Sequence, residues 1–237
     1  MYEKLAEYYD MFMDAPYDKW TAYIEKRLKS GASGMDIGCG TGEFTLRLAR
    51  DGYAVIGADI SAQMLEIANK KAKKQGQKVE FVLQNAESFQ VFRPLDFITA
   101  NCDVVNYLKN PQKFFTRAYR ALKAGGVFAF DISSRYKLQN ILGDQVYTLT
   151  KNGVTYIWEN FYDEKNDKVD IKMTFFAPAE NNNYSKSEDY QTQYAHTRQS
   201  IEDKLARAGF SKIEVYGFLS DDEPSQSEER LHFIAYK

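Results

Sequence analysis

The segment between Ser33 and Arg50, SGMDIGCGTGEFTLRLAR, constrains the possible folds of this chain most narrowly. In it a short apolar run passes through Gly38, Gly40 and Gly42 into a stretch with helical periodicity. Glycine lets a backbone turn tightly and approach a ligand closely, and the first N–H groups of a helix have no partner within it. We therefore expect a strand, a glycine turn and a helix, with polar oxygens of a ligand lying on the turn.

The same alternation continues through the first half of the chain. Strands are predicted at SGMDI, YAVIGAD, KVEFVL, LDFITA and GVFAFDIS, and helices at about residues 42–50, 61–75 and 111–123, the last ended by the glycines of KAGG. This order is typical of right-handed βαβ units that form a parallel sheet buried on both faces. An α/β core is the expected result.

The pattern changes in the second half, where residues 144–195 alternate with a period of two and show no helical periodicity. Asn152-Gly153 predicts a hairpin turn within an antiparallel sheet, and APAENNNYSKSED is expected to be a polar loop. One face of the strand after the hairpin would carry Val169, Ile171, Met173 and Phe175. A helix at QSIEDKLARAGF and strands at KIEVYGFL and ERLHFIAYK then resume the α/β pattern.

Composition excludes several classes of protein. No run of the 237 residues approaches the roughly 18 apolar residues of a membrane span, and MYEKLAEYYD carries charges where a signal peptide would be apolar, so we expect a cytoplasmic protein. The net charge of −2 and pI of about 5.8 argue against nucleic acid as a partner. Two cysteines and two distant histidines give neither a disulfide framework nor the spacing of a zinc site, so no metal is predicted.

Taken with its surroundings, the glycine turn resembles the first motif of class I S-adenosylmethionine (AdoMet)-dependent methyltransferases. That motif, an acidic residue followed by GxGxG, reads MDIGCGTGEF here, and VIGADIS adds an acidic residue at the end of the second strand. Nicotinamide oxidoreductases instead carry GxGxxG or GxGxxA, and the third small residue is replaced here by Glu43, which is unfavourable beside a diphosphate. The resemblance implies AdoMet as cofactor.

The resemblance also implies an architecture. We expect a seven-stranded, mostly parallel Rossmann-like sheet of strand order 3-2-1-4-5-7-6, with an antiparallel β cap inserted after strand five. Lid helices would occupy residues 1–32, the AdoMet-binding core residues 33–135 and 196–237, and the cap residues 136–195. An elaborated edge of the main sheet is the alternative to a cap.

By the same resemblance, Asp36 would lie near the amino end of the cofactor and Asp59 would accept hydrogen bonds from both ribose hydroxyls. Ile60 and Met64 would offer apolar surface beside the adenine. Asn85 stands where relatives carry Asp and would read the adenine amino group, with a turn residue as the alternative. The full predicted cofactor set is Asp36, Gly38, Cys39, Gly40, Thr41, Gly42, Asp59, Ile60, Met64, Asn85, Ala86, Glu87 and Asn101.

Catalytic groups for methyl transfer would lie at the carboxyl ends of strands four and five, in TANCDVVNYL and FDISSRY, where ligands bind in open α/β sheets. The reaction needs alignment of the acceptor, exclusion of water and, for some acceptors, removal of a proton. We predict Asp103 and His196 as the catalytic candidates. Asp103 and Asp131 are also weighed as magnesium ligands, but a cationic substrate group or a neighbouring hydroxyl is favoured as the partner of one of them.

Substrate and lid residues complete the predicted site. Aromatic faces suit a sulfonium cation, so Tyr9, Tyr17 and Trp20 are lid candidates, with packing on the core as the alternative. The remaining candidates are Asn106, Tyr107 and Arg198, the last to hold an anionic substrate. For His196 and Arg198 the alternative is a hinge held by ordinary hydrogen bonds.

The sequence therefore predicts an AdoMet-dependent methyltransferase that acts on a small molecule. Two alternatives stay open: an RNA or protein methyltransferase that uses the cap for docking, and an AdoMet-binding module without catalysis.

Overall fold

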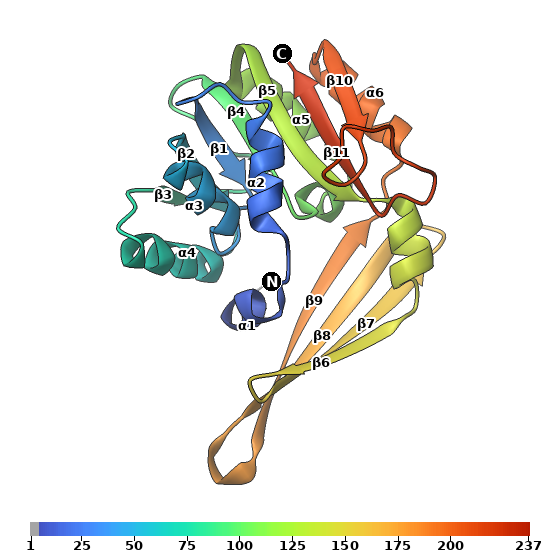
Figure 1. Ribbon diagram of the computed structural model, residues 1–237. Coiled ribbons are helices and arrows are strands. Elements are labelled where there is room, and N and C mark those ends of the chain that lie inside the picture. Colours follow the sequence, from blue (N-terminus) through green and yellow to red (C-terminus); the bar gives the residue numbers. More distant parts are fainter. Residues whose placement is uncertain (1–4) are drawn as a thin grey trace.

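The computed structural model describes residues 5–237, which form two β-sheets with helices around the larger one (Figure 1). Residues 1–4, the start of the predicted lid segment, lie outside the described residues. The helices are α1 (Leu5–Phe12), α2 (Tyr17–Glu25), α3 (Glu43–Arg50), α4 (Ala62–Lys74), α5 (Gln112–Ala121) and α6 (Arg198–Ala208), with short helical turns η1 (Val104–Tyr107), η2 (Lys137–Leu142) and η3 (Glu180–Asn182).

The larger sheet has the order β10-β11-β5-β4-β1-β2-β3. Its strands are β1 (Ser33–Ile37), β2 (Ala54–Asp59), β3 (Glu80–Leu83), β4 (Leu95–Ala100), β5 (Leu122–Ser133), β10 (Lys212–Tyr216) and β11 (Arg230–Tyr236). The first five are parallel, and β11 runs antiparallel to both of its neighbours. Counted along this sheet alone, the order is 3-2-1-4-5-7-6, which confirms the predicted fold class.

Two apolar clusters hold the helices on this sheet. Phe114 and Phe115 of α5 and Ile201 of α6 are fully buried in one cluster, whereas Trp20 of α2 and Phe44 of α3 belong to the other. In Figure 1, α2 crosses the front of the sheet and α5 and α6 lie behind it. Because both faces are covered, the strands read as nearly continuous apolar runs.

The predicted helix stop at KAGG is wrong in detail. Helix α5 already ends at Ala121, and Leu122 begins β5, so the two glycines lie within the strand. Gly125 has φ +74, and the register between β4 and β5 shifts between Leu95 and Phe97. The glycines therefore form a bulge at the start of the strand rather than a helix cap.

The smaller sheet is antiparallel and consists of β6 (Val146–Lys151), β7 (Val154–Asp163), β8 (Lys168–Pro178) and β9 (Tyr184–Tyr194) in that order. The hairpin at Asn152-Gly153 is confirmed, since both residues have positive φ and Lys151 pairs with Val154. The predicted polar loop is shorter than expected, because β9 already begins at Tyr184 and takes up half of it.

One face of the smaller sheet is apolar, as its alternation predicted. Val169, Ile171, Met173 and Phe175 of β8 are all buried there. Helix α1 packs on this face, with the Tyr8 ring 5.4 Å from Phe175 and the Phe12 ring 4.6 Å from Tyr156. In Figure 1 the sheet extends away from the core and α1 lies beside it. Helix α1 is therefore placed between the smaller sheet and the carboxyl ends of the core strands.

Candidate active site

The glycine turn after β1 is fixed by β2, because the N–H groups of Gly38 and Cys39 both donate to the carbonyl of Ala58, at 2.7 and 3.0 Å. Gly38 has φ +71, and a Cβ there would stand 2.3 Å from a methyl carbon of Val104. Gly40 has φ +54, but no atom lies within 4 Å of where its Cβ would be. Gly38 is therefore required by packing, whereas Gly40 faces open space on which a ligand can lie.

Asp59, at the end of β2, closes the other side of the turn. Its two carboxylate oxygens accept hydrogen bonds from the N–H groups of Gly40 and Ser61, each at 2.8 Å. Burial raises the pKa of this carboxyl, and the backbone donors oppose that effect. A carboxylate has about four acceptor positions, so each oxygen keeps capacity for a further donor such as a ribose hydroxyl.

Asp36 lies beneath the turn and is 2% exposed. Its oxygens accept hydrogen bonds from the hydroxyls of Thr45, at 2.6 Å, and Thr99, at 2.8 Å. Burial raises the pKa of Asp36 to about 6, although both hydroxyls favour the ionised form. Asp36 thus joins β1, β4 and α3, and its predicted place beside the amino end of the cofactor stays a prediction.

The residues predicted for the adenine separate into exposed and buried ones. Ile60 is 57% exposed, and Leu83, which pairs with Asp59 across β2 and β3, is 62% exposed. Met64 is only 3% exposed, so it packs inward and offers little surface. Ile60 and the unpredicted Leu83 therefore form the free apolar surface beside the turn.

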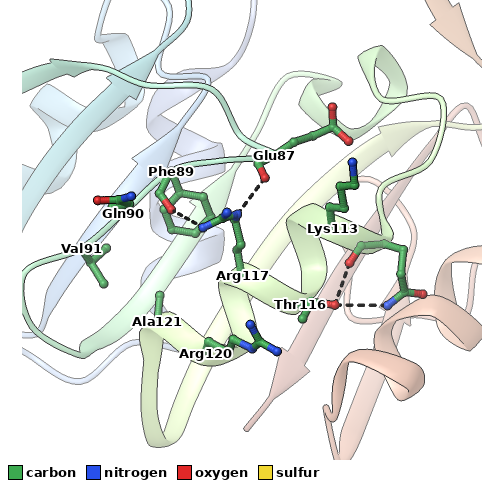
Figure 2. Close-up of a pocket in the computed structure, with 10 residues that line it drawn as sticks. Glu87, Phe89, Gln90, Val91, Lys113, Thr116, Arg117, Arg120 and Ala121 are labelled. Carbon is green, nitrogen blue, oxygen red and sulfur yellow. Dashed lines mark hydrogen bonds between the residues drawn. The ribbon is translucent and has the colours of Figure 1, made fainter.

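Asn85 forms the turn that was its alternative role, and its predicted contact with the adenine stays a prediction. Its side-chain oxygen accepts from the N–H of Glu87 at 2.8 Å, and its carbonyl accepts from Ser88. The Glu87 carbonyl in turn accepts from Arg117 of α5 at 2.7 Å. Glu87 lines a cavity of about 570 Å³ between the β3–β4 connection and α5 (Figure 2). The glycine turn contributes no residue to this cavity, and the predicted cofactor contact of Glu87 stays a prediction.

The end of β4 carries a buried amide and a strained backbone. Asn101 is 5% exposed, and neither its amide oxygen nor its amide nitrogen has a partner among residues 5–237. Cys102 and Asp103 follow with φ +60 and +66, a conformation held by Asp131, which accepts both of their N–H groups. Unpaired buried polar groups and left-handed non-glycine residues are costly and concentrate at functional sites.

Asp103 is tied into a buried cluster that the sequence did not indicate. Arg230, at the start of β11, contacts the carboxylates of both Asp103 and Asp131 through Nη1. Burial opposes ionisation of Asp103, but Arg230 and Lys137 outweigh it and lower its pKa, whereas burial raises the pKa of Asp131 to about 7. The guanidinium therefore holds Asp103 in its ionised form, and its predicted catalytic role stays a prediction.

The same cluster contains the two carboxylates, Asp103 and Asp131, that were weighed as magnesium ligands. The guanidinium of Arg230 lies between the two carboxylates that would have served as ligands. No group of three or more metal-binding side chains occurs within residues 5–237. The guanidinium of Arg230 contacts both carboxylates, and the cationic substrate group that was favoured over a metal stays a prediction.

Three tyrosines surround the end of β4. Tyr9 of α1 lies close to Cys102, Tyr17 and Tyr107, and burial is the main reason that the pKa of its hydroxyl is raised. Burial likewise raises the pKa of Tyr17. These hydroxyls stay protonated at neutral pH and act as neutral hydrogen-bonding groups.

Trp20 is buried against the core. Its ring is 2% exposed and packs edge-on against Phe218 and His232, with the guanidinium of Arg230 at 5.2 Å from the ring centre. It attaches α2 to the core, which was the alternative interpretation.

Three further predicted residues are used for structure. His196 is buried with Nε2 2.9 Å from the carbonyl of Leu108, and burial lowers its pKa, so one ring nitrogen is engaged and its predicted catalytic role stays a prediction. Arg198 is paired with Glu202, at 3.2 Å, and with Glu223, and its predicted contact with an anionic substrate stays a prediction. The amide of Asn106 is consumed by bonds to the backbone of Ser133 and Tyr194.

Tyr107 connects the core to the smaller sheet. Its hydroxyl donates to Oε1 of Gln191 at 2.9 Å and accepts from Nε2 of Gln193 at 3.1 Å. Sequence reasoning named Tyr107 but missed both glutamines. Their alternation in YQTQY was a signal, since it places them on one face of β9.

A polar network attaches α1 to the glycine turn. Thr41 donates to Asp10 at 2.6 Å, and Lys71 of α4 pairs with both Asp10, at 2.5 Å, and Glu43, at 2.6 Å. Arg47 adds a second cation to Glu43 at 2.5 Å. Glu43, whose position in the motif is unfavourable for a dinucleotide, thus belongs to a network of ion pairs that connects α1, α3 and α4.

Comparison with known proteins agrees with this geometry. A family described as "Methyltransferase domain" matches residues 35–130. "Putative methyltransferase GWCH70_2453" of Geobacillus sp. (strain WCH70) is 35% identical over 100% of this chain and 99% of its own length. The crystal structure of an S-adenosylmethionine-dependent methyltransferase from Clostridium acetobutylicum superposes with a TM-score of 0.88, at 28% identity over 99% of this chain and 98% of that one.

A second similar structure contains the cofactor. It is AdoMet-bound CalS10, an amino pentose methyltransferase from Micromonospora echinaspora, with a TM-score of 0.70 and 16% identity over 100% of this chain and 98% of that one. The strand order and the glycine turn define a class I methyltransferase fold. The chain belongs to the family of AdoMet-dependent methyltransferases, and AdoMet is its cofactor.

The residues of this chain fit that cofactor. Gly40 leaves an open surface, Asp59 has acceptor capacity beside it, and the amide of Asn101 is buried without a partner in the described chain. We propose that Asp59 holds the ribose and that Ile60 and Leu83 lie against the adenine.

No helix of residues 5–237 is long and apolar enough to cross a membrane.

Asp59→Ala tests the proposed ribose contact. We expect AdoMet affinity to fall at least tenfold, because each charge-assisted hydrogen bond is worth about 1.5–3 kcal/mol. Isothermal calorimetry measures the loss, and Glu66→Ala, on the exposed side of α4, is the control that should bind normally. An unchanged dissociation constant in folded Asp59→Ala would remove Asp59 from the cofactor site.

Proposed function

We propose that the methyl acceptor is a small molecule, bound between the glycine turn, α1 and the smaller sheet. The observation that carries this proposal is the contact of Tyr107 with Gln191 and Gln193, which joins the end of β4 to the inner face of β9. A site closed by α1 on one side and by a sheet on the other favours a compact acceptor over a folded RNA or protein. CalS10 is described as an amino pentose methyltransferase, so a chain of this fold can accommodate a small acceptor.

The proposal assigns functions to the parts of the chain. Residues 33–135 and 196–237 bind AdoMet, residues 136–195 form the cap over the acceptor, and the helices within residues 1–32 form the lid. The packing of Tyr8 and Phe12 on the cap and the bond of Asp10 to Thr41 support this division, because α1 contacts both other parts.

Bound AdoMet supplies an activated methyl group on a positively charged sulfur. The residues of this chain then contribute by positioning the acceptor. We propose that the hydroxyls of Tyr9, Tyr17 and Tyr107 orient the acceptor beside the end of β4 and that α1 excludes water. Asp103 and His196 are engaged in other contacts, so alignment rather than a dedicated base is the main contribution of the protein.

A fractionated cell extract tests the proposed acceptor class. The extract is separated into an ultrafiltrate of small molecules, a protein fraction and an RNA fraction, and each is incubated with enzyme and AdoMet. We expect S-adenosylhomocysteine to form only with the ultrafiltrate. Formation only with protein or RNA would contradict the proposal, and AdoMet binding without turnover in any fraction would favour a non-catalytic module.

A further inference from the structure

Strand β9 carries three buried polar side chains at alternate positions. Asp189, Gln191 and Gln193 are 6%, 7% and 5% exposed. Each has a buried atom without a hydrogen-bond partner in residues 5–237: Oδ2 of Asp189, Nε2 of Gln191 and Oε1 of Gln193. We refer to these three residues as the β9 row.

The register of the smaller sheet shows where the β9 row points. Asp189, Gln191 and Gln193 pair with Met173, Ile171 and Val169 of β8, and paired residues lie on the same face of a sheet. That face is the one covered by the aromatic side chains of α1. The row therefore points inward, toward the space between the cap and the end of β4.

Packing alone does not explain these residues. Their partners on β8 are apolar, and a buried polar atom without a partner costs free energy that an apolar side chain at the same position would avoid. Asp189 is the acidic member of the three, and no described lysine, arginine or histidine forms an ion pair with it. At the end of β4, the amide of Asn101 is also buried and unpartnered in the described residues. Such a set is explained when a ligand supplies the missing partners.

The unpaired atoms specify the chemistry of that ligand. An ionised carboxylate only accepts hydrogen bonds, as does the amide oxygen of Gln193, whereas Nε2 of Gln191 donates. A matching molecule must offer a cation or donors to two positions and an acceptor to the third. Amines and hydroxyl groups together meet this requirement, whereas an anionic acceptor would be repelled by Asp189.

We propose that the β9 row is the acceptor subsite and that the acceptor is a small hydroxylated amine. Asp189 binds its amino group, and Gln191 and Gln193, held in place by the hydroxyl of Tyr107, bind its hydroxyl groups. This inference rests on the proposed function, since it specifies the class of small molecule that is methylated.

Ion exchange separates the two proposals. The small-molecule ultrafiltrate is passed over a cation exchanger at neutral pH, and both fractions are assayed for S-adenosylhomocysteine formation. Activity in the retained, cationic fraction supports the subsite. Activity only in the flow-through overturns the amine assignment but leaves a small acceptor standing. Activity only with protein or RNA overturns the proposed function itself.

Asp189→Asn tests the residue directly, and Glu188→Gln is its matched control. Glu188 is the adjacent carboxylate on β9, on the opposite face, where it pairs with Lys186 at 2.7 Å. We expect Asp189→Asn to lower kcat/KM for the retained fraction at least tenfold while KM for AdoMet changes less than twofold. Glu188→Gln should leave both values unchanged. Equal effects of the two substitutions would overturn the proposal.

Thermal unfolding gives a measurement that needs no acceptor. If the charge of Asp189 awaits a ligand, Asp189→Asn should raise the unfolding midpoint of the free protein, because a neutral amide is less costly to bury. Glu188→Gln should not raise it. A lower midpoint for Asp189→Asn would show that the carboxylate has a structural function and would overturn the proposal.

Discussion

Gly40→Ala should give a folded protein that has lost most of its affinity for AdoMet, at least tenfold. No atom lies within 4 Å of the added Cβ, so the only folding cost is the left-handed backbone at φ +54, about 1–2 kcal/mol. The methyl group would occupy the open face of the turn, where we place the cofactor. Calorimetric titration with AdoMet and a denaturant titration separate the two effects.

Gly76→Ala is the matched control for this substitution. Gly76 follows α4, has φ +66, and likewise has no atom within 4 Å of the position that an added Cβ would take. It should lose a similar amount of stability while binding AdoMet as the unmodified protein does. If Gly40→Ala also binds AdoMet normally, the open face of the turn is not the cofactor surface.

Arg230→Met should produce the largest loss of stability, about 3–5 kcal/mol in the free energy of unfolding. The substitution removes the cation shared by Asp103 and Asp131, and Asp131 is completely buried. Two carboxylates would then lie close together without the guanidinium between them. Urea unfolding at neutral pH measures the loss.

Two variants test whether that loss of stability comes from uncompensated buried charge. Arg135→Met removes an ion pair with Asp167 whose side chains are both more than 40% exposed, and it should cost less than about 1 kcal/mol. Adding Asp103→Asn to Arg230→Met should restore part of the stability, because it removes one of the two uncompensated charges. Equal losses for Arg230→Met and Arg135→Met would contradict a buried charge cluster.

The sequence predicted those features that depend on local periodicity. The alternation of strands and helices, the glycine turn and the Asn152-Gly153 hairpin are local, and the structure confirms them. The positions of Asp36 and Asp59 beside the turn also follow from chain order, because each ends or nearly ends a strand that neighbours it.

The roles of individual polar side chains depend on partners that are distant in the chain. Arg230 meets Asp103 across 127 residues, and its pairing required the register of β11 on β5. His196 and Arg198 look available in the sequence, but Leu108 and Glu223 already engage them. Polarity near a predicted site is therefore a weaker indicator than polarity that remains unpartnered after folding, as at Asn101.

Helix α1 is held by an ion pair on one side and by aromatic packing on the other. Toward the glycine turn it is held by the charged contact of Asp10 with Lys71, and toward the smaller sheet by the rings of Tyr8 and Phe12. Dissolved salt weakens the first kind of contact and leaves the second intact. Rising ionic strength should therefore loosen the contact of α1 with the glycine turn first. AdoMet should then exchange faster, while the contact of α1 with the smaller sheet persists.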